Sequence, residues 1–175
     1  MTTELLAPAG GQEALVAAVQ SGADAVYMGF GAFNARRSAR NFSDEEFRAA
    51  VSYCHLRGVK VYLTLNTLVT DRELPALAEE ARVASECGVD AILVQDWGVL
   101  AALREIIPDV PLHASTQMSL HTLSGVAEAA RLGMTRAVLA RELNREEIAE
   151  ICRSSPIEIE TFVHGALCMC YSGQC

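Results

Sequence analysis

The sequence predicts an α/β fold of the (β/α)8, or TIM-like, barrel class, with seven strand-helix units and the last strand missing. Short apolar runs alternate with longer helical patterns along all 175 residues, without an interrupting linker. Polar residues follow several of these runs at their carboxyl ends, where a barrel gathers its functional groups. Because a complete barrel usually needs about 250 residues, we interpret residues 1–175 as one incomplete barrel domain of a longer protein.

The strand candidates are short runs rich in aliphatic and β-branched residues. A run such as Val59–Asn66 is too apolar for a sheet with one face in water, so it favours a parallel sheet covered by helices. An open doubly wound sheet is the other arrangement of such units, but no G-x-G-x-x-G loop follows the first strand. The predicted strands are Glu4–Ala7, Ala25–Gly29, Val59–Asn66, Ala91–Gln95, Pro111–Ser115, Arg136–Ala140 and Ile157–Val163.

Six helices are expected between these strands, and local signals mark their ends. Ser43 precedes Glu46, and Asn144 precedes Glu147, at the spacing of a capping box. Glycines that favour a left-handed conformation close four of the helices, at Gly22, Gly58, Gly88 and Gly133. The predicted helices are Gly11–Ser21, Ser43–Arg57, Asp71–Cys87, Trp97–Ile107, Thr122–Leu132 and Asn144–Cys152.

Charge and composition exclude several classes of protein. A net charge of −8 argues against broad, sequence-independent binding to nucleic acid. The amino terminus lacks the pattern of a secretory signal, and no apolar run approaches the ~18 residues of a membrane span, so we expect a cytoplasmic protein. Its six cysteines are therefore expected as thiols. Cys54, Cys87 and Cys152 stand singly in helical patterns, which is typical of buried, unreactive cysteine.

The most informative segment is the last twelve residues, His164–Cys175, which directly follow the seventh predicted strand. They contain Cys168, Cys170 and Cys175 in the spacing C-x-C-x4-C. This spacing belongs neither to a zinc ribbon or finger nor to a ferredoxin run. Thiols gathered at the functional edge of a barrel indicate a soft-metal site, although three reduced cysteines without a metal remain an alternative.

Glu160–Cys168 followed by Tyr171–Cys175 resembles the signature of the U32 peptidase-like, or collagenase-like protease, family. Further segments support the resemblance through nearly the whole chain. They are Leu5–Gly10, Tyr27–Gly29, Phe33–Arg36 and His113–Gln117.

The resemblance implies a barrel-like region and, as in several members of the family, a 4Fe-4S cluster held by four cysteines. Two of those ligands match Cys168 and Cys175, and the other two are expected beyond residue 175. Cys170 stands where the family's motif usually has a small residue, so no ligand role is carried over to it. Members of the family act in oxygen-independent hydroxylation of tRNA uridine, rRNA cytidine or the ubiquinone ring, and others were named peptidases.

Two other functions are weighed against hydroxylation. A peptidase is conceivable with Cys168 as nucleophile and His164 as its base, but the chain has neither an H-E-x-x-H nor a G-x-S-x-G motif. The second alternative is a non-enzymatic accessory protein that carries electrons or binds RNA for a partner subunit.

Further candidate residues follow other predicted strands. Arg36 is a candidate to bind a small carboxylated oxygen donor or an RNA phosphate, because its guanidinium binds such groups with paired hydrogen bonds. Asn66 and Gln117 are candidates for substrate binding at the strand ends. Glu160 and His164 are the catalytic candidates, and an ion pair with a basic residue inside the barrel is the structural alternative for Glu160.

Overall fold

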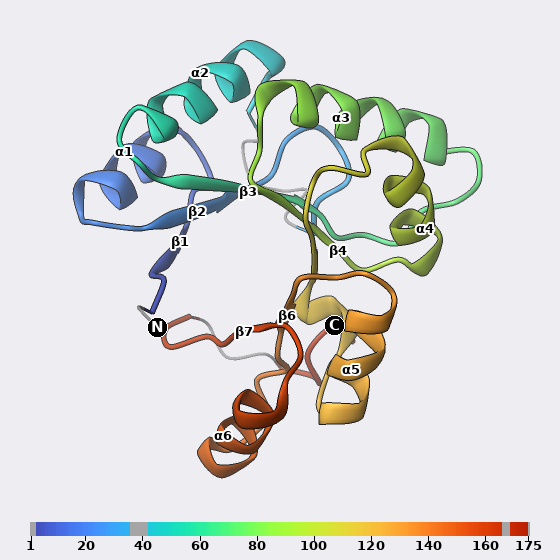
Figure 1. Ribbon diagram of the computed structural model, residues 1–175. Coiled ribbons are helices and arrows are strands. Elements are labelled where there is room, and N and C mark those ends of the chain that lie inside the picture. The colour runs from blue at the N-terminus through green and yellow to red at the C-terminus, as the bar shows by residue number, and fades with distance from the viewer. Residues whose placement is uncertain (1–2, 36–41, 166–168, 175) are drawn as a thin grey trace. The chain divides into compact units, whose positions relative to one another are not determined.

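The computed structural model describes residues 3–35, 42–165 and 169–174 (Figure 1). The chain forms two compact units, residues 1–110 and 111–175. Within the part that the structure describes, no helix has both the length and the apolar character needed to cross a membrane.

The first unit is a parallel sheet of four strands that pair in chain order. Figure 1 shows its four helices on one side of these strands. Its strands are β1 (Leu6–Pro8), β2 (Ala25–Met28), β3 (Lys60–Leu65) and β4 (Ala91–Val94). Its helices are α1 (Gln12–Gln20), α2 (Asp44–His55), α3 (Leu74–Cys87) and α4 (Trp97–Ile106).

The core of the first unit lies where the helices cover the sheet. All four residues of β4 are buried, and Val61 and Leu63 of β3 are inaccessible to solvent. From the helices, Leu15, Phe47, Leu77 and Leu103 are buried completely. Burial on this scale explains why the strand runs read as continuously apolar in the sequence.

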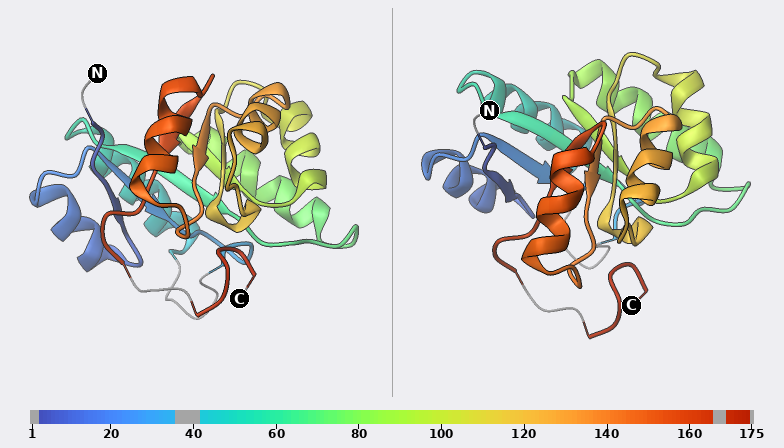
Figure 2. Two further views of the ribbon diagram at one scale, coloured as in Figure 1. Left: turned by 90° about the horizontal axis from the view of Figure 1, so that it is seen from below. Right: turned by 60° about the horizontal axis from the view of Figure 1, so that its bottom comes forward.

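The second unit contains three further parallel strands, and their pairs β5–β6 and β6–β7 also follow chain order. The strands are β5 (Leu112–Ala114), β6 (Arg136–Val138) and β7 (Glu158–Glu160). The helices are α5 (Leu123–Arg131) and α6 (Arg145–Ser154), with one 3-10 turn, η1 (Thr116–Met118), after β5. Figure 2 shows α6 in orange-red and the segment after β7 in red.

The predicted helix signals are largely confirmed. Ser43 and Asn144 each form a complete capping box at the start of α2 and α6. The four glycines expected after helices all have positive φ, between 70° and 89°. Two polar residues at strand ends have a local role instead, since Asp96 caps α4 and Ser115 caps η1.

Two expectations differ from the structure. The sixth and seventh strands end at Val138 and Glu160 rather than at Ala140 and Val163, and these two end residues pair with each other. Of the helical cysteines, Cys54 is buried as expected, whereas Cys87 is only partly buried and Cys152 is exposed. The prediction of a buried Cys152 is therefore wrong, because α6 buries the neighbouring Ile151 and leaves Cys152 exposed to solvent.

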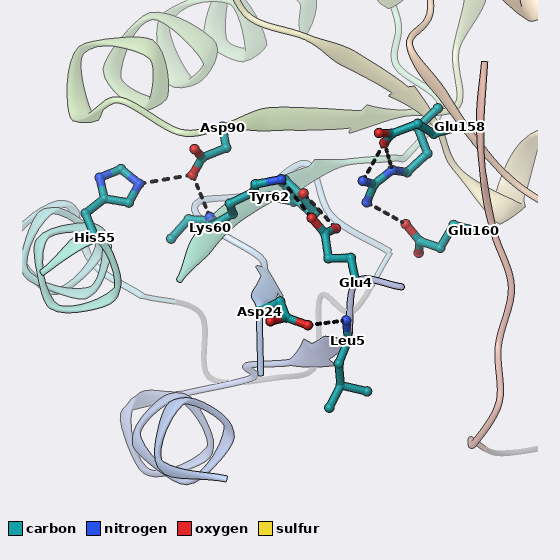
Figure 3. Close-up of polar contacts among 11 residues, drawn as sticks. Glu4, Leu5, Asp24, His55, Lys60, Tyr62, Asp90, Glu158 and Glu160 are labelled. Carbon is teal, nitrogen blue, oxygen red and sulfur yellow. Dashed lines mark hydrogen bonds and ion pairs between the residues drawn. The ribbon is translucent and has the colours of Figure 1, made fainter. Parts of the chain in front are cut away.

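Polar contacts join the amino ends of the strands in the first unit (Figure 3). The Glu4 carboxylate accepts hydrogen bonds from Lys60 Nζ and the Tyr62 hydroxyl, both at 2.8 Å. Asp90 accepts one from the backbone N–H of Val61 at 2.8 Å and lies 3.0 Å from His55 Nε2. In a parallel barrel this edge serves stability, and the opposite edge carries the chemistry.

Candidate functional site at the carboxyl ends of the strands

Residues 169–174 form a loop between the two cysteines predicted to bind the cluster, and we call it the motif loop. Glu142, in the loop after β6, holds it through Ser172, whose N–H donates to Glu142 Oε1 at 2.8 Å and whose hydroxyl donates to the same oxygen at 3.2 Å. Ser172 Oγ also accepts a hydrogen bond from the backbone N–H of Arg141 at 3.0 Å. Ser172 is completely buried, so the motif loop is anchored on the loop after β6.

A second anchor joins the motif loop to the turn after β5. Ser119 Oγ donates to the carbonyl oxygen of Ser172 at 2.5 Å and accepts from Gln174 Nε2 at 3.2 Å. Gly173 has φ +82°, and a Cβ atom there would lie 2.5 Å from the carbonyl oxygen of Gln117. Only glycine fits this position without strain, because the backbone is left-handed and the neighbouring turn leaves no room.

His121 links the two anchors. Its Nδ1 lies 2.7 Å from the carbonyl oxygen of Ser119, and its Nε2 lies 3.1 Å from Glu142 Oε2. Both partners only accept hydrogen bonds, so the two bonds coexist when both ring nitrogens carry hydrogen. Burial acts to raise the pKa of Glu142, but the hydrogen bonds from Ser172 and His121 outweigh it and hold that pKa below its usual value.

A pocket of about 260 Å³ opens at the carboxyl ends of β6 and β7. One aromatic ring, Phe162, lies in it, and the guanidinium carbon of Arg141 is 4.1 Å from the ring centre. Most of its wall is apolar, and Thr161, His164 and Arg141 add polar groups. The lining is Leu139, Ala140, Arg141, Leu143, Ile148, Thr161, Phe162, Val163, His164 and Gly165.

The two catalytic candidates lie in different surroundings. His164 is exposed and contributes to the wall of the pocket. Glu160 is largely buried, with its Oε2 atom 3.5 Å from Arg136 Nη1, and Arg136 also donates to Glu158 Oε2 at 2.6 Å (Figure 3). This is the ion pair expected as the structural alternative for Glu160, and a catalytic role for either residue stays a prediction.

Two of the three substrate-binding candidates, Asn66 and Gln117, contact the backbone of neighbouring loops. Asn66, just after β3, accepts a hydrogen bond from the N–H of Ala35 at 3.1 Å and so supports the loop after β2. Gln117 lies in η1, and its carbonyl oxygen is the atom that closes the space at Gly173. Arg36, Cys168 and Cys175 lie outside the residues that the structure describes.

Glu80 of α3 is a titratable residue that the sequence did not single out. Its Oε2 accepts a hydrogen bond from the N–H of Ala32 at 3.2 Å, beside Gly31, where a Cβ atom would meet the carboxylate. Burial raises the pKa of Glu80 to about 7, opposed by the Ala32 hydrogen bond and assisted by the Asp44 carboxylate. The carboxyl group thus supports the start of the loop that leads to Arg36.

The sequence did not predict contacts between residues that lie far apart in the chain. Glu142 and Ser172 are thirty residues apart, and nothing local marks them as a pair. Two features of the sequence pointed to this site: Glu142 is a polar residue that follows a predicted strand, and Gly173 lies inside the motif. Among residues 3–35, 42–165 and 169–174, no cluster of three His, Cys, Asp or Glu side chains is arranged to hold a metal ion, and Cys170 is an exposed thiol.

Parallel strands that alternate with helices, with a glycine-containing motif loop fastened at their carboxyl edge, define a protein of the TIM-like barrel class. The solved structure of a U32 peptidase superimposes with a TM-score of 0.75 over 91% of this chain and 68% of that one, at 18% identity, which confirms the fold class. The model of peptidase family U32 matches residues 10–175, and the chain belongs to this family.

Curated relatives are similar over 98% of the chain. A 23S rRNA 5-hydroxycytidine synthase of Escherichia coli is 42% identical, with 26% of its length covered. A tRNA hydroxylation protein of Bacillus subtilis is 39% identical, with 41% covered, and a collagenase of Porphyromonas gingivalis is 36% identical, with 44% covered. The chain therefore spans less than half the length of these relatives.

Proposed function

We propose that these residues form the barrel domain of a longer protein that hydroxylates a base in tRNA or rRNA, in the cytoplasm and without molecular oxygen. The observation that carries the proposal is the anchored motif loop, combined with similarity over 98% of the chain to proteins named for RNA hydroxylation. Hydroxylation of a quinone ring stays a prediction, and the comparisons favour RNA over it.

The proposed cofactor is a 4Fe-4S cluster with Cys168 and Cys175 as two of its ligands. The donor set fits this group, because thiolates are the ligands that iron-sulfur clusters use. The motif loop between the two cysteines is hydrogen-bonded to Glu142 and to Ser119, and this anchoring supports a role in holding two ligands. A bound cluster would supply electron transfer or a site for an oxygen-donor substrate, and two more thiolates would come from outside residues 1–175.

The chain's own residues have separate tasks in this proposal. Glu142, Ser119 and His121 hold the motif loop in place. Asn66 and Glu80 position the loop after β2, and Arg36 on that loop would bind a carboxylated donor. His164, exposed at the pocket, is the group available to exchange a proton with a bound substrate.

The cluster is tested by anaerobic purification of the protein at its natural length, with iron and sulfide analysis and a visible spectrum. Cys168→Ala and Cys175→Ala should each lose iron, whereas Cys152→Ala, which changes an exposed cysteine on α6, should retain it. A protein that stays colourless after reconstitution contradicts the cluster.

The reaction is tested in cells that lack the protein. Mass spectrometry of their tRNA and rRNA should show the loss of one hydroxylated base, restored by the wild-type protein. If every hydroxylated base persists, the proposed function is wrong. Gelatin hydrolysis that survives iron removal and is lost in Cys168→Ala would instead favour a peptidase, the activity for which the Porphyromonas relative is named.

A further inference from the structure

The pocket beside the motif loop has features that neither the cluster nor its ligands explain. It lies at the carboxyl ends of β6 and β7, and one wall is formed by Arg141, whose backbone N–H is hydrogen-bonded to Ser172 of the motif loop. One hydrogen bond therefore joins the wall of the pocket to the motif loop. A molecule in the pocket would lie next to the segment that carries the reaction.

An aromatic ring and a guanidinium group occur together in this pocket. Phe162 keeps 39% of its surface exposed, which is unusual for a phenylalanine in an otherwise apolar wall. The guanidinium carbon of Arg141 lies over the ring, 4.1 Å from its centre, so the two groups form a cation–π pair. The guanidinium offers a cationic plane to a planar ligand, and the ring offers an apolar face with partial negative charge.

The size of the pocket limits the ligand. Pockets for drug-sized molecules start at about 300 Å³, so a volume of about 260 Å³ suits one small planar group. The apolar residues Leu139, Leu143 and Ile148 favour a ring over a phosphate, while Thr161 and His164 provide hydrogen bonds for its edge.

From these observations we infer that the pocket binds one unstacked base of a single-stranded RNA segment, stacked against Phe162 and Arg141. The inference rests on the proposed function and specifies where its substrate binds. Proteins read single-stranded RNA by stacking extruded bases on aromatic rings and arginine planes and by bonding to the base edges. The wall contains each of these elements, with Thr161 and His164 at the base edge.

The test is photo-cross-linking of the natural-length protein to a short single-stranded RNA that carries 5-iodouridine, a base that cross-links to the aromatic ring on which it stacks. Mass spectrometry should place the cross-link at Phe162. Phe162→Leu should abolish it and weaken RNA binding by about five- to 150-fold, the usual loss for one stacked base. Phe162→Trp should preserve both.

Matched variants separate stacking from loss of charge or fold. Arg141→Gln should weaken binding, whereas Arg153→Gln, which removes an exposed arginine from the last turn of α6, should leave it unchanged. If Phe162→Leu fails to fold, the position of the cross-link in the wild-type protein still decides the question.

The outcomes distinguish this inference from the proposed function. A cross-link at another site, in a protein whose loss still abolishes a hydroxylated base, overturns the pocket assignment alone. Absence of RNA binding together with persistence of every hydroxylated base overturns both. Competition of the cross-link by gelatin peptides but not by unlabelled RNA would assign the pocket to a peptide and likewise overturn the inference.

Discussion

Single residues at the functional edge are constrained by partners distant in sequence. Gly173 and Glu80 illustrate this, because one must lack a side chain to fit against Gln117 and the other supports Ala32 from a different element. The sequence marked Gly173 as part of a motif but gave no sign of Glu80. A carboxyl group in a helical pattern normally indicates a solvated face, and only the fold brings this one against a loop.

Replacing Glu80 by glutamine should stabilise the protein above pH 7 and change little near pH 4.5. The pKa of Glu80 rises from 4.5 to about 7 on folding, so the folded state holds a proton that the unfolded state loses, and stability falls as pH rises between these values. Glu80→Gln removes this loss, which is about 1–2 kcal/mol after allowance for solvent screening.

Urea denaturation of the wild type and Glu80→Gln at both ends of this pH range measures the effect. Glu79→Gln is the control, because Glu79 is the exposed neighbour on the same helix. An equal response of the two variants to pH would contradict the assignment.

Replacing Gly173 by alanine should loosen the motif loop. The new Cβ would lie 2.5 Å from a backbone carbonyl in a left-handed conformation, a strain of about 1–3 kcal/mol. Faster amide hydrogen exchange at Ser172 and lower iron content are the expected results. Gly22→Ala has a similar φ, +89°, with open space around it, so it should lose some stability without changing exchange at Ser172. Unaltered amide exchange at Ser172 in Gly173→Ala would contradict this prediction, because it would mean that the turn after β5 shifts to accommodate the new Cβ atom.

The secondary-structure elements were predictable because their signals are local. Periodicity and capping residues predicted the seven strands and six α-helices of the described residues, with most boundaries within a few residues, but not the 3-10 turn η1. The exception is β7, whose expected carboxyl half is not strand because its length depends on β6, a partner more than twenty residues earlier in the chain. The same separation kept the sequence from identifying Arg136 as the basic partner of Glu160 and of Glu158.

Replacing Arg136 by methionine should destabilise β7. Arg136 is nearly buried and pairs with Glu160, which is also largely buried, so its loss leaves a carboxylate without its cationic neighbour. We expect a cost of about 2–4 kcal/mol, partly recovered in the double variant Arg136→Met/Glu160→Gln, which removes the buried charge. Thermal melts compare these with Arg131→Met, an exposed arginine whose loss should have no measurable effect. A double variant no more stable than Arg136→Met would exclude a charge effect.

At the scale of the whole molecule, the fold class was the property that the sequence predicted best, because it depends on a strand-helix pattern repeated along the whole chain. The barrel fold agrees with the solved U32 structure. The repeated pattern could not identify the substrate, which depends on a few particular residues. A net charge of −8 leaves few cations for phosphates, yet the relatives are named for reactions on RNA. A base-stacking pocket reconciles these facts, because stacking requires no excess of positive charge.

This reconciliation predicts a weak dependence of RNA binding on salt. Each phosphate contact to a single strand contributes about −0.7 to the slope of log affinity against log salt concentration. Since stacking on Phe162 contributes nothing to it, the slope should stay above about −2. Phe162→Leu should lower affinity without altering the slope, whereas Arg141→Gln should make it shallower by at most about 0.7. Fluorescence anisotropy titrations over a range of salt concentrations, with Arg153→Gln as control, measure both quantities. A slope of about −5 in the wild type would mean that phosphates, rather than a stacked base, dominate recognition.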